Sequence, residues 1–163
     1  MREHERQVLR TAWRLLGSRD DARDAAQEVF LRLFKYLHRF DERRELAPWL
    51  YRVTVNVCRD MERKRRKAWS QTVDPVPPVA RDAEAVRRLS QEERMAFVEQ
   101  ALKLLPQKER AAIVLRDIEG LPTNEVARIL GSSQTTVRTQ ISRGRVKLKQ
   151  HCQRLMEKDN EAQ

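Results

Sequence analysis

The residue types that usually perform catalysis are scattered along this chain. Its three histidines, His4, His38 and His151, lie far apart, and its two cysteines, Cys58 and Cys152, have neither a CxxC partner nor a neighbouring histidine pair. The acidic residues near the most basic segment lack the spacing of a metal site. We therefore expect no enzymatic activity, no metal and no cofactor, and two reduced thiols.

The arginines are the residues of this chain whose spacing indicates a function, and that function would be binding to phosphate groups. A helix is predicted from about Trp49 to Lys67, and its outward positions recur every three or four residues. These positions, called the basic stripe below, hold Arg52, Asn56, Arg59, Arg63 and Arg66. Guanidinium groups bind phosphate oxygens, and an amide among them can pair with a base edge. The stripe therefore predicts a nucleic-acid surface.

Aromatic side chains accompany the basic stripe in the sequence. Phe40, Trp49 and Tyr51 lie just before it or at its start. Rings beside cations are what single-stranded bases need for stacking, so this combination favours single-stranded nucleic acid. The alternative is that the rings belong to the core and the arginines form a solvated face.

A preceding helix, with Ser18 as its predicted N-cap, has two different faces. Its core-facing positions hold Ala22, Ala26, Val29, Leu33 and Leu37. The opposite sector holds Asp20, Asp24, Gln27, Leu31 and Phe34. An outward leucine and phenylalanine beside aspartates are typical of a docking surface for another protein. Packing of another part of the small bundle over this sector is the alternative interpretation.

The last part of the chain has the pattern of a helix-turn-helix. A short helix predicted over 123–130 is followed by a Gly131-Ser132-Ser133 turn and a long helix over 134–155. Outward positions near the start of the long helix hold Thr135, Thr139, Ser142 and Arg143. Between Val126 and Met156 there are seven Arg or Lys residues and no acidic residue. This pattern predicts that the start of the long helix enters the major groove of DNA.

These surfaces must be positioned by a small helical framework. The 163 residues contain four glycines and are rich in strong helix formers, so we expect an all-α fold. A proline-containing segment, 70–90, is predicted to be a linker between two small helical domains, 1–69 and 91–163. Lys and Arg number 34 against 24 Asp and Glu, a net charge of +10 that favours a polyanionic partner.

The chain has no stretch suited to a membrane. Its longest purely apolar run, 111–115, is far shorter than a spanning helix. Its first residues are polar and charged, which predicts no signal peptide. We expect a cytoplasmic protein without membrane insertion.

Several ordered segments resemble the extracytoplasmic-function (ECF) sigma factors of bacterial RNA polymerase. Residues 20–34 are similar to the second conserved region of that family, and so are residues 48–56 with the basic run that follows them. Residues 104–149 are similar to its fourth region. The resemblance covers nearly the whole chain, and it implies a subunit that directs transcription initiation.

The resemblance also implies a partner for each surface. Docking on the clamp helices of the largest polymerase subunit would use Asp24, Gln27, Glu28, Phe30 and Leu31. Melting and holding the minus-ten promoter element would use Arg43, Arg52, Asn56, Arg59, Arg63 and Arg66. Reading the minus-thirty-five element would use Thr135, Arg138, Thr139, Ser142 and Arg143. The flap of the second-largest subunit and an anti-sigma factor are further implied partners, and the loop 39–47 would capture a flipped base.

One alternative from a different class stays open at this point. A stand-alone helix-turn-helix regulator that binds duplex DNA as a dimer would explain the second half of the chain. It would explain neither the outward face of the helix after Ser18 nor the basic stripe. The discriminating observation is whether specific DNA binding needs core polymerase. The sequence departs from the common family pattern at Ser132, Gln140 and Ser142, so the promoter sequence is not predicted.

Overall fold

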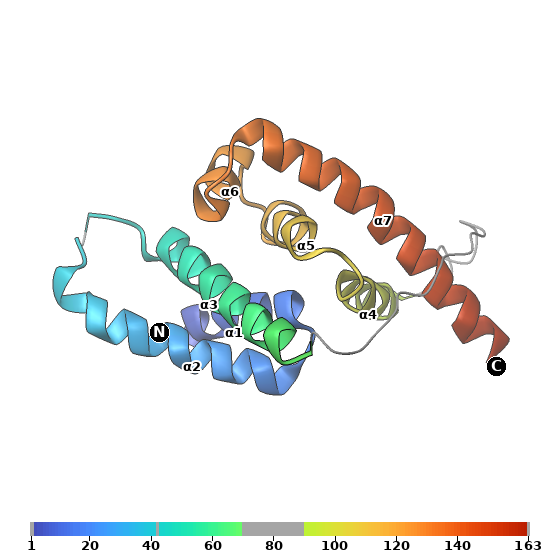
Figure 1. The fold of residues 1–163 in the computed structure, drawn as a ribbon, viewed down its shortest axis with the longest axis horizontal. Coiled ribbons are helices and arrows are strands. Elements are labelled where there is room, and N and C mark those ends of the chain that lie inside the picture. Colours follow the sequence, from blue (N-terminus) through green and yellow to red (C-terminus); the bar gives the residue numbers. More distant parts are fainter. Residues whose placement is uncertain (1, 42, 70–89, 163) are drawn as a thin grey trace.

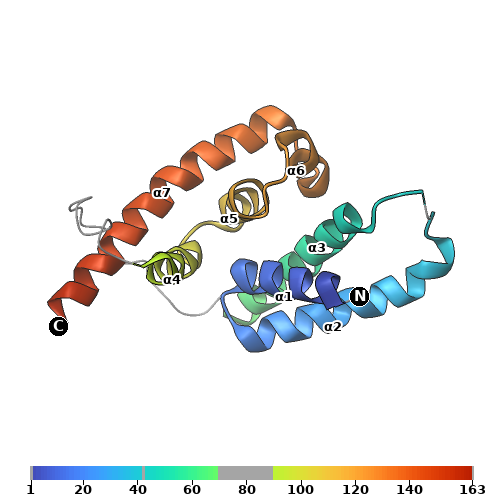
Figure 2. The same ribbon diagram turned by 180° about the vertical axis from the view of Figure 1, so that it is seen from behind.

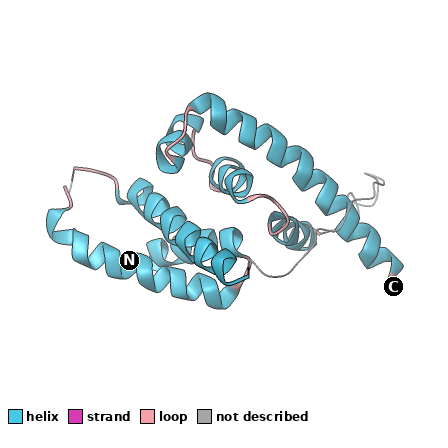
Figure 3. Cartoon of the chain, in the orientation of Figure 1, coloured by secondary structure: helices cyan, strands magenta, loops and turns pink. Residues whose placement is uncertain are grey.

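Every regular element in the described part of the chain is helical. The computed structural model describes residues 2–41, 43–69 and 90–162, and Figure 3 shows these residues as helices joined by short loops. The helices form two groups, α1 to α3 and α4 to α7 (Figure 1). The predicted fold class, all-α with two small helical domains, is confirmed. The predicted linker lies outside the described residues except for Ser90.

The first group forms because its helices are amphipathic and clearly punctuated. It comprises α1 (Arg2–Leu16), α2 (Arg19–Tyr36), the 3-10 turn η1 (Leu37–Arg39) and α3 (Leu46–Trp69). Gly17, with φ of 72°, ends α1, and the Ser18 hydroxyl caps α2 by accepting a hydrogen bond from the Asp21 N–H at 3.3 Å. Pro48 lies in the first turn of α3, where backbone N–H groups have no helical partner.

The core-facing positions predicted for α2 are buried with one exception. Ala22, Ala26, Val29 and Leu33 are buried, and they pack with Val8 of α1 and Leu50 of α3. Leu37, which was predicted to be buried, is 51% exposed. That prediction is wrong because α2 ends at Tyr36 and the tighter turn that follows carries Leu37 away from the apolar face of the helix.

The second group contains the predicted helix-turn-helix. It comprises α4 (Gln91–Leu102), α5 (Gln107–Ile113), the π-helical turn η3 (Val114–Ile118), α6 (Thr123–Leu130) and α7 (Gln134–Glu161). Figure 2 shows α7 running along one side of this group. Gly144 allows α7 to lie close to α5, because a Cβ at this position would come within 2.8 Å of Ile113 Cγ1.

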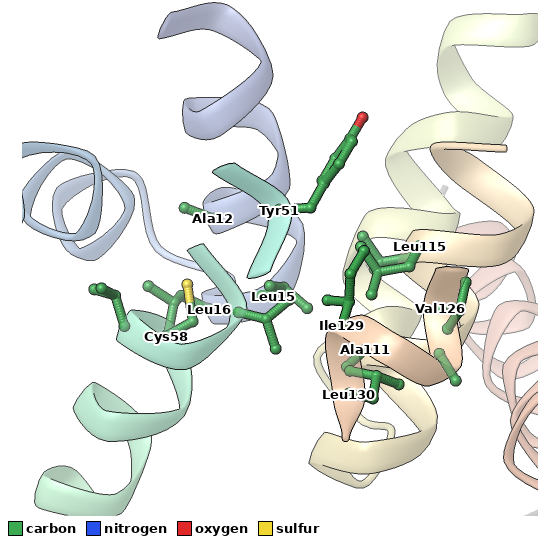
Figure 4. Close-up of a cluster of buried hydrophobic side chains, with 14 of the residues drawn as sticks. Ala12, Leu15, Leu16, Tyr51, Cys58, Ala111, Leu115, Val126, Ile129 and Leu130 are labelled. Carbon is green, nitrogen blue, oxygen red and sulfur yellow. The ribbon is translucent and has the colours of Figure 1, made fainter. Parts of the chain in front are cut away.

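The two groups share one hydrophobic core. The helix α3 packs on α6, and α1 contacts α4, α5 and η3. In Figure 4, Leu15 of the first group points toward Leu115 and Ile129 of the second. This contact places the basic stripe and the helix-turn-helix on one compact body.

Candidate nucleic-acid and protein interfaces

The outward sector of α2 is exposed, as predicted. Asp24 and Gln27 are exposed, and the apolar side chains Leu31 and Phe34 are 57% and 79% exposed. We call these four residues the docking face. Two large apolar side chains in contact with water on one helix are a marker of a protein-binding surface.

A groove of about 770 Å³ runs beside the docking face, between α1 and α2. It is lined by Glu5, Leu9, Arg23, Ala26, Gln27, Phe30 and Leu31. Three predicted docking residues, Gln27, Phe30 and Leu31, therefore meet in one hollow, where Phe30 also packs against the core. Glu28 lies outside this lining, and its carboxylate pairs with Arg32 at 2.7 Å.

Sequence reasoning did not identify the contribution of α1 to this groove. Glu5 and Leu9 complete its wall, although neither was predicted as a site residue. The sequence did contain a sign of this wall. Leu9 is an apolar residue next to the buried Val8, and it lies outside the narrow apolar stripe of α1, where a polar residue would be expected.

The basic stripe forms part of a second groove, of about 580 Å³. Its lining comprises Arg32, Asn56, Arg59, Asp60, Arg63, Arg66 and Gln107. Four of the six residues predicted for the minus-ten element thus lie together. Arg52 is exposed on α3 outside the lining, and Arg43 lies in the loop, where its N–H donates to Asp41 Oδ1 at 3.0 Å.

The groove is electropositive because its lining holds four arginines and one acidic residue, Asp60. Among the described residues, Arg63 is the one member of the stripe with an ion pair, to Asp60 of the same helix. Arg32 joins the groove from α2 and Gln107 joins it from α5, which sequence spacing within α3 could not show. The arrangement can bind several successive phosphates of one strand.

The aromatic residues separate into two roles. Trp49 precedes Arg52 by three residues and so continues the stripe, and its ring stacks on Tyr36 with centroids 5.2 Å apart and planes at 13°. Tyr36 is 40% exposed. Tyr51 is buried instead, and its hydroxyl donates to Glu119 Oε2 at 2.9 Å. The prediction that Tyr51 accompanies the stripe is therefore wrong, and Trp49, which stacks on Tyr36, also packs against the core.

The helix-turn-helix has a well-defined turn. Gly131 takes a left-handed conformation with φ of 62°, and the Ser132 N–H donates to the Ala127 carbonyl at 3.0 Å. The Ser133 hydroxyl then caps α7 by accepting from the Thr136 N–H at 3.1 Å. This turn fixes where α7 starts relative to α6.

The residues predicted to read the minus-thirty-five element all lie on the exposed surface of α7. They are Thr135, Arg138, Thr139, Ser142 and Arg143. Arg138 makes a long contact to Gln134 at 3.4 Å, and the Thr139 hydroxyl donates to the Thr135 carbonyl at 3.1 Å. Val137 and Ile141 are buried on the other side, so packing fixes which face of α7 is presented.

Comparison with known proteins supplies a family for this geometry. Residues 1–68 match Sigma-70 region 2, and residues 98–148 match Sigma-70 region 4. The chain is 33% identical over 147 residues to the ECF RNA polymerase sigma factor SigM of Mycobacterium tuberculosis, covering 90% of this chain and 72% of that protein. The chain belongs to the ECF sigma factors. It is also 37% identical over 155 residues to SigE of Mycolicibacterium smegmatis, with 93% of this chain covered but only 59% of that relative's length.

Two solved structures share the fold of this chain. The sigma factor RpoE, solved with the anti-sigma factor NepR from Bartonella quintana, shares the fold with a TM-score of 0.72 at 22% identity, with 91% of each chain covered. CnrH, solved with the cytosolic domain of CnrY, has a TM-score of 0.60 at 30% identity, covering 87% of this chain and 78% of that one.

The described residues include two free thiols and no metal-binding cluster. Within 2–41, 43–69 and 90–162, no group of His, Cys, Asp or Glu is placed to hold a metal ion. Both cysteines are free thiols, and burial, aided by the nearby Glu62 carboxylate, raises the pKa of Cys58 to about 12. No described helix is long and apolar enough to cross a bilayer.

Proposed function

We propose that this chain is a promoter-specificity subunit of RNA polymerase. It binds core polymerase through the docking face and the adjoining α1–α2 groove. It opens and holds the minus-ten element in the α3 groove, and it reads the minus-thirty-five element with the start of α7. It works by binding alone and performs no chemistry of its own.

The observation that carries this proposal is the presence of three separate exposed surfaces on one ECF sigma fold. The docking face is apolar and acidic, which suits a protein partner. The groove on α3 that contains the basic stripe, called the α3 groove, holds four guanidinium groups, and a stacked aromatic pair lies outside its lining near the start of α3. Together they suit a strand whose bases have left the duplex. The start of α7 is a convex polar helix, which suits an intact major groove.

Strand opening follows from differential binding to the separated strand. Unstacking a base costs a few kcal/mol, and contacts available only to the exposed strand offset that cost. Arg59, Arg63 and Arg66 would hold successive phosphates while the amide of Asn56 meets a base edge. The loop predicted over 39–47 is shorter than expected, because η1 ends at Arg39 and α3 begins at Leu46. The segment between these two elements, with Arg43, would receive the flipped base.

Location and regulation follow from the same proposal. A subunit that joins polymerase on promoter DNA works in the cytoplasm, without membrane insertion. RpoE and CnrH were each solved with a second protein, an anti-sigma factor in the case of RpoE. We extend a regulator of this kind to this chain, together with the second-largest-subunit flap as a contact of its fourth region.

A native gel with purified bacterial core polymerase tests this proposal. The full chain should co-migrate with core, and the complex should shift promoter DNA that the chain alone does not select. A chain that ignores core and binds a duplex site by itself would support the stand-alone regulator instead.

A further inference from the structure

A small hollow, of about 160 Å³, opens between α1 and the start of α2. These two helices pack side by side (Figure 2). The hollow adjoins the larger α1–α2 groove, because Leu9 and Arg23 line both. The rest of its lining is different, and none of the three proposed binding surfaces accounts for it. The lining residues are Leu9, Arg10, Trp13, Arg19, Ala22 and Arg23.

The floor of the hollow is apolar. Leu9 and Trp13 are partly buried and pack against the core, and Ala22 is only 2% exposed. No amide, hydroxyl or carboxylate side chain is among the lining residues. A bulky apolar side chain is therefore the group that this floor can bury most favourably.

The rim of the hollow is cationic. It consists of the exposed side chains of Arg10, Arg19 and Arg23. Within the part of the chain that the structure describes, the one ion pair of these arginines joins Arg23 to Asp20 at 3.7 Å, and those two side chains are 72% and 92% exposed. An ion pair so exposed to water contributes little. The rim therefore leaves three guanidinium groups available to an anionic partner.

One of these arginines is already positioned by an aromatic ring. The Cζ atom of Arg19 lies 5.4 Å from the centroid of the Trp13 ring. This cation–π contact restricts the guanidinium group without occupying its N–H donors, which remain free for carboxylate oxygens. It also covers one face of the indole, so that face is not open to stacking by a nucleic-acid base.

Comparison with the α3 groove favours a protein partner for the hollow. Both surfaces carry several arginines, but the α3 groove places Asn56 and Gln107 beside them, and side-chain amides can pair with base edges. The hollow places Leu9 and Ala22 beside its arginines instead. An apolar floor inside a cationic rim is complementary to an apolar side chain flanked by carboxylates, which is a feature of proteins.

We infer that this hollow binds an acidic segment of a protein partner, in which one bulky apolar side chain lies between carboxylates. The apolar side chain enters the hollow and contacts Leu9 and Trp13. The carboxylates pair with Arg10, Arg19 and Arg23 at the rim. Because every residue of the site comes from α1 and α2, the inference does not rest on the proposed function.

Fluorescence anisotropy with the full chain tests this site. The probe is a fluorescein-labelled peptide of glutamates with one central leucine. The rim variant Arg10→Gln/Arg19→Gln/Arg23→Gln should bind this peptide about tenfold or more weakly than the parent chain, because charge-assisted hydrogen bonds are lost. A peptide with alanine in place of the leucine should also bind the parent chain more weakly, because the apolar contact is lost.

A matched control removes the same charge from exposed positions of α6 and α7. This control, Arg128→Gln/Lys149→Gln/Lys158→Gln, should change the affinity for the leucine peptide by less than about twofold, because those positions are screened from the hollow. A labelled single strand of DNA serves as a second probe. Its binding should be affected no more by the rim variant than by the control.

A charge reversal keeps the test decisive if the rim variant fails to fold. Arg10→Glu/Arg23→Glu retains the contact of Arg19 with Trp13. It should bind the glutamate peptide more weakly than the parent chain, and it should bind a peptide with lysines in place of the glutamates more tightly.

Three results would overturn the site. The first is equal affinity of the parent chain and the folded rim variants for the leucine peptide. The second is a parent chain that binds the leucine peptide no better than its alanine version. The third is a loss of DNA binding in the rim variant as large as its loss of peptide binding, because the rim would then be a nucleic-acid surface.

Discussion

The two basic surfaces of this sigma factor are built in opposite ways. The α3 groove is concave and gathers side chains from three helices, with Arg32 from α2 and Gln107 from α5 beside the stripe. The start of α7 is convex, and its polar residues come from one helix whose position is fixed by the Gly131–Ser133 turn. Both carry arginines, so charge alone does not distinguish them.

The difference in shape separates their tasks. A concave surface lined with cations can contact successive phosphates of a strand that has left a duplex, and the aromatic pair near the start of α3 can contact the faces of its bases. A convex helix can contact only edges that the duplex already presents. On the proposed function, the comparison implies that one chain divides promoter recognition into reading an intact segment and holding an opened one.

The largest expected effect comes from a change that should impair both DNA surfaces at once, because both need core polymerase. Asp24→Lys reverses a charge on the docking face and should weaken binding to core polymerase by about 2 kcal/mol or more, roughly 30-fold. Neither DNA surface should then support initiation. Co-sedimentation with core polymerase measures the loss, and Asp159→Lys, an exposed acid near the end of α7, is the control. Normal binding by Asp24→Lys would remove α2 from the docking assignment.

The next test distinguishes the role of the α3 groove from that of the start of α7. Arg59→Ala/Arg63→Ala should weaken binding of the polymerase complex to a forked promoter with an exposed single strand. The slope of log affinity against log salt should fall by about 1.4, or about 0.7 for each lost phosphate contact. Arg65→Ala is the control, because Arg65 pairs with Asp21 and does not line the groove. An equal fall in the control would mean that the groove has no special role.

A smaller effect is expected on the reading side. Arg143→Ala should cost about 1–3 kcal/mol on the preferred promoter, with selectivity lost at one position of the minus-thirty-five element. Binding measured on a set of duplexes, with Lys149→Ala alongside, checks this expectation. A uniform loss on every sequence would make Arg143 a phosphate contact.

The smallest effect concerns pH and the contact between the two groups of helices. Burial, together with the Glu119 carboxylate, raises the pKa of Tyr51 above its ordinary value of 10. Its contribution to stability is therefore fully present below pH 10 and is lost as the pH rises above 10. Alkaline titration by tyrosinate absorbance in Tyr36→Phe, where Tyr51 is the last tyrosine, should show the raised midpoint. A midpoint at or below 10 would contradict the buried contact.

Much of the fold could be predicted because local signals agreed with one another. Apolar spacing located the helices, and Ser18 and Gly131 marked boundaries through their own backbone and side-chain chemistry. Leu37 was wrongly expected in the core because it lies four residues after the buried Leu33, as the next position of the apolar stripe would. The α-helix has already ended at Tyr36, so this spacing no longer applies.

The sites were only partly predictable for a different reason. Residues on one helix face, such as Asn56 and Arg59, follow from spacing, but Arg32 and Gln107 join them through packing between distant segments. The core shared by the two groups of helices was not predicted either, because it also depends on packing between distant segments. Nothing local to Tyr51 indicates that its hydroxyl meets Glu119, 68 residues away.

Promoter opening tests the central claim most directly. Permanganate reactivity of thymines in the minus-ten region would be measured with the chain alone, with core polymerase alone and with both, on a promoter selected by run-off transcription. We predict reactive thymines only when both proteins are present, and their loss with Arg59→Ala/Arg63→Ala. Specific binding to closed duplex by the chain alone, with no opening in the presence of core polymerase, would contradict the account.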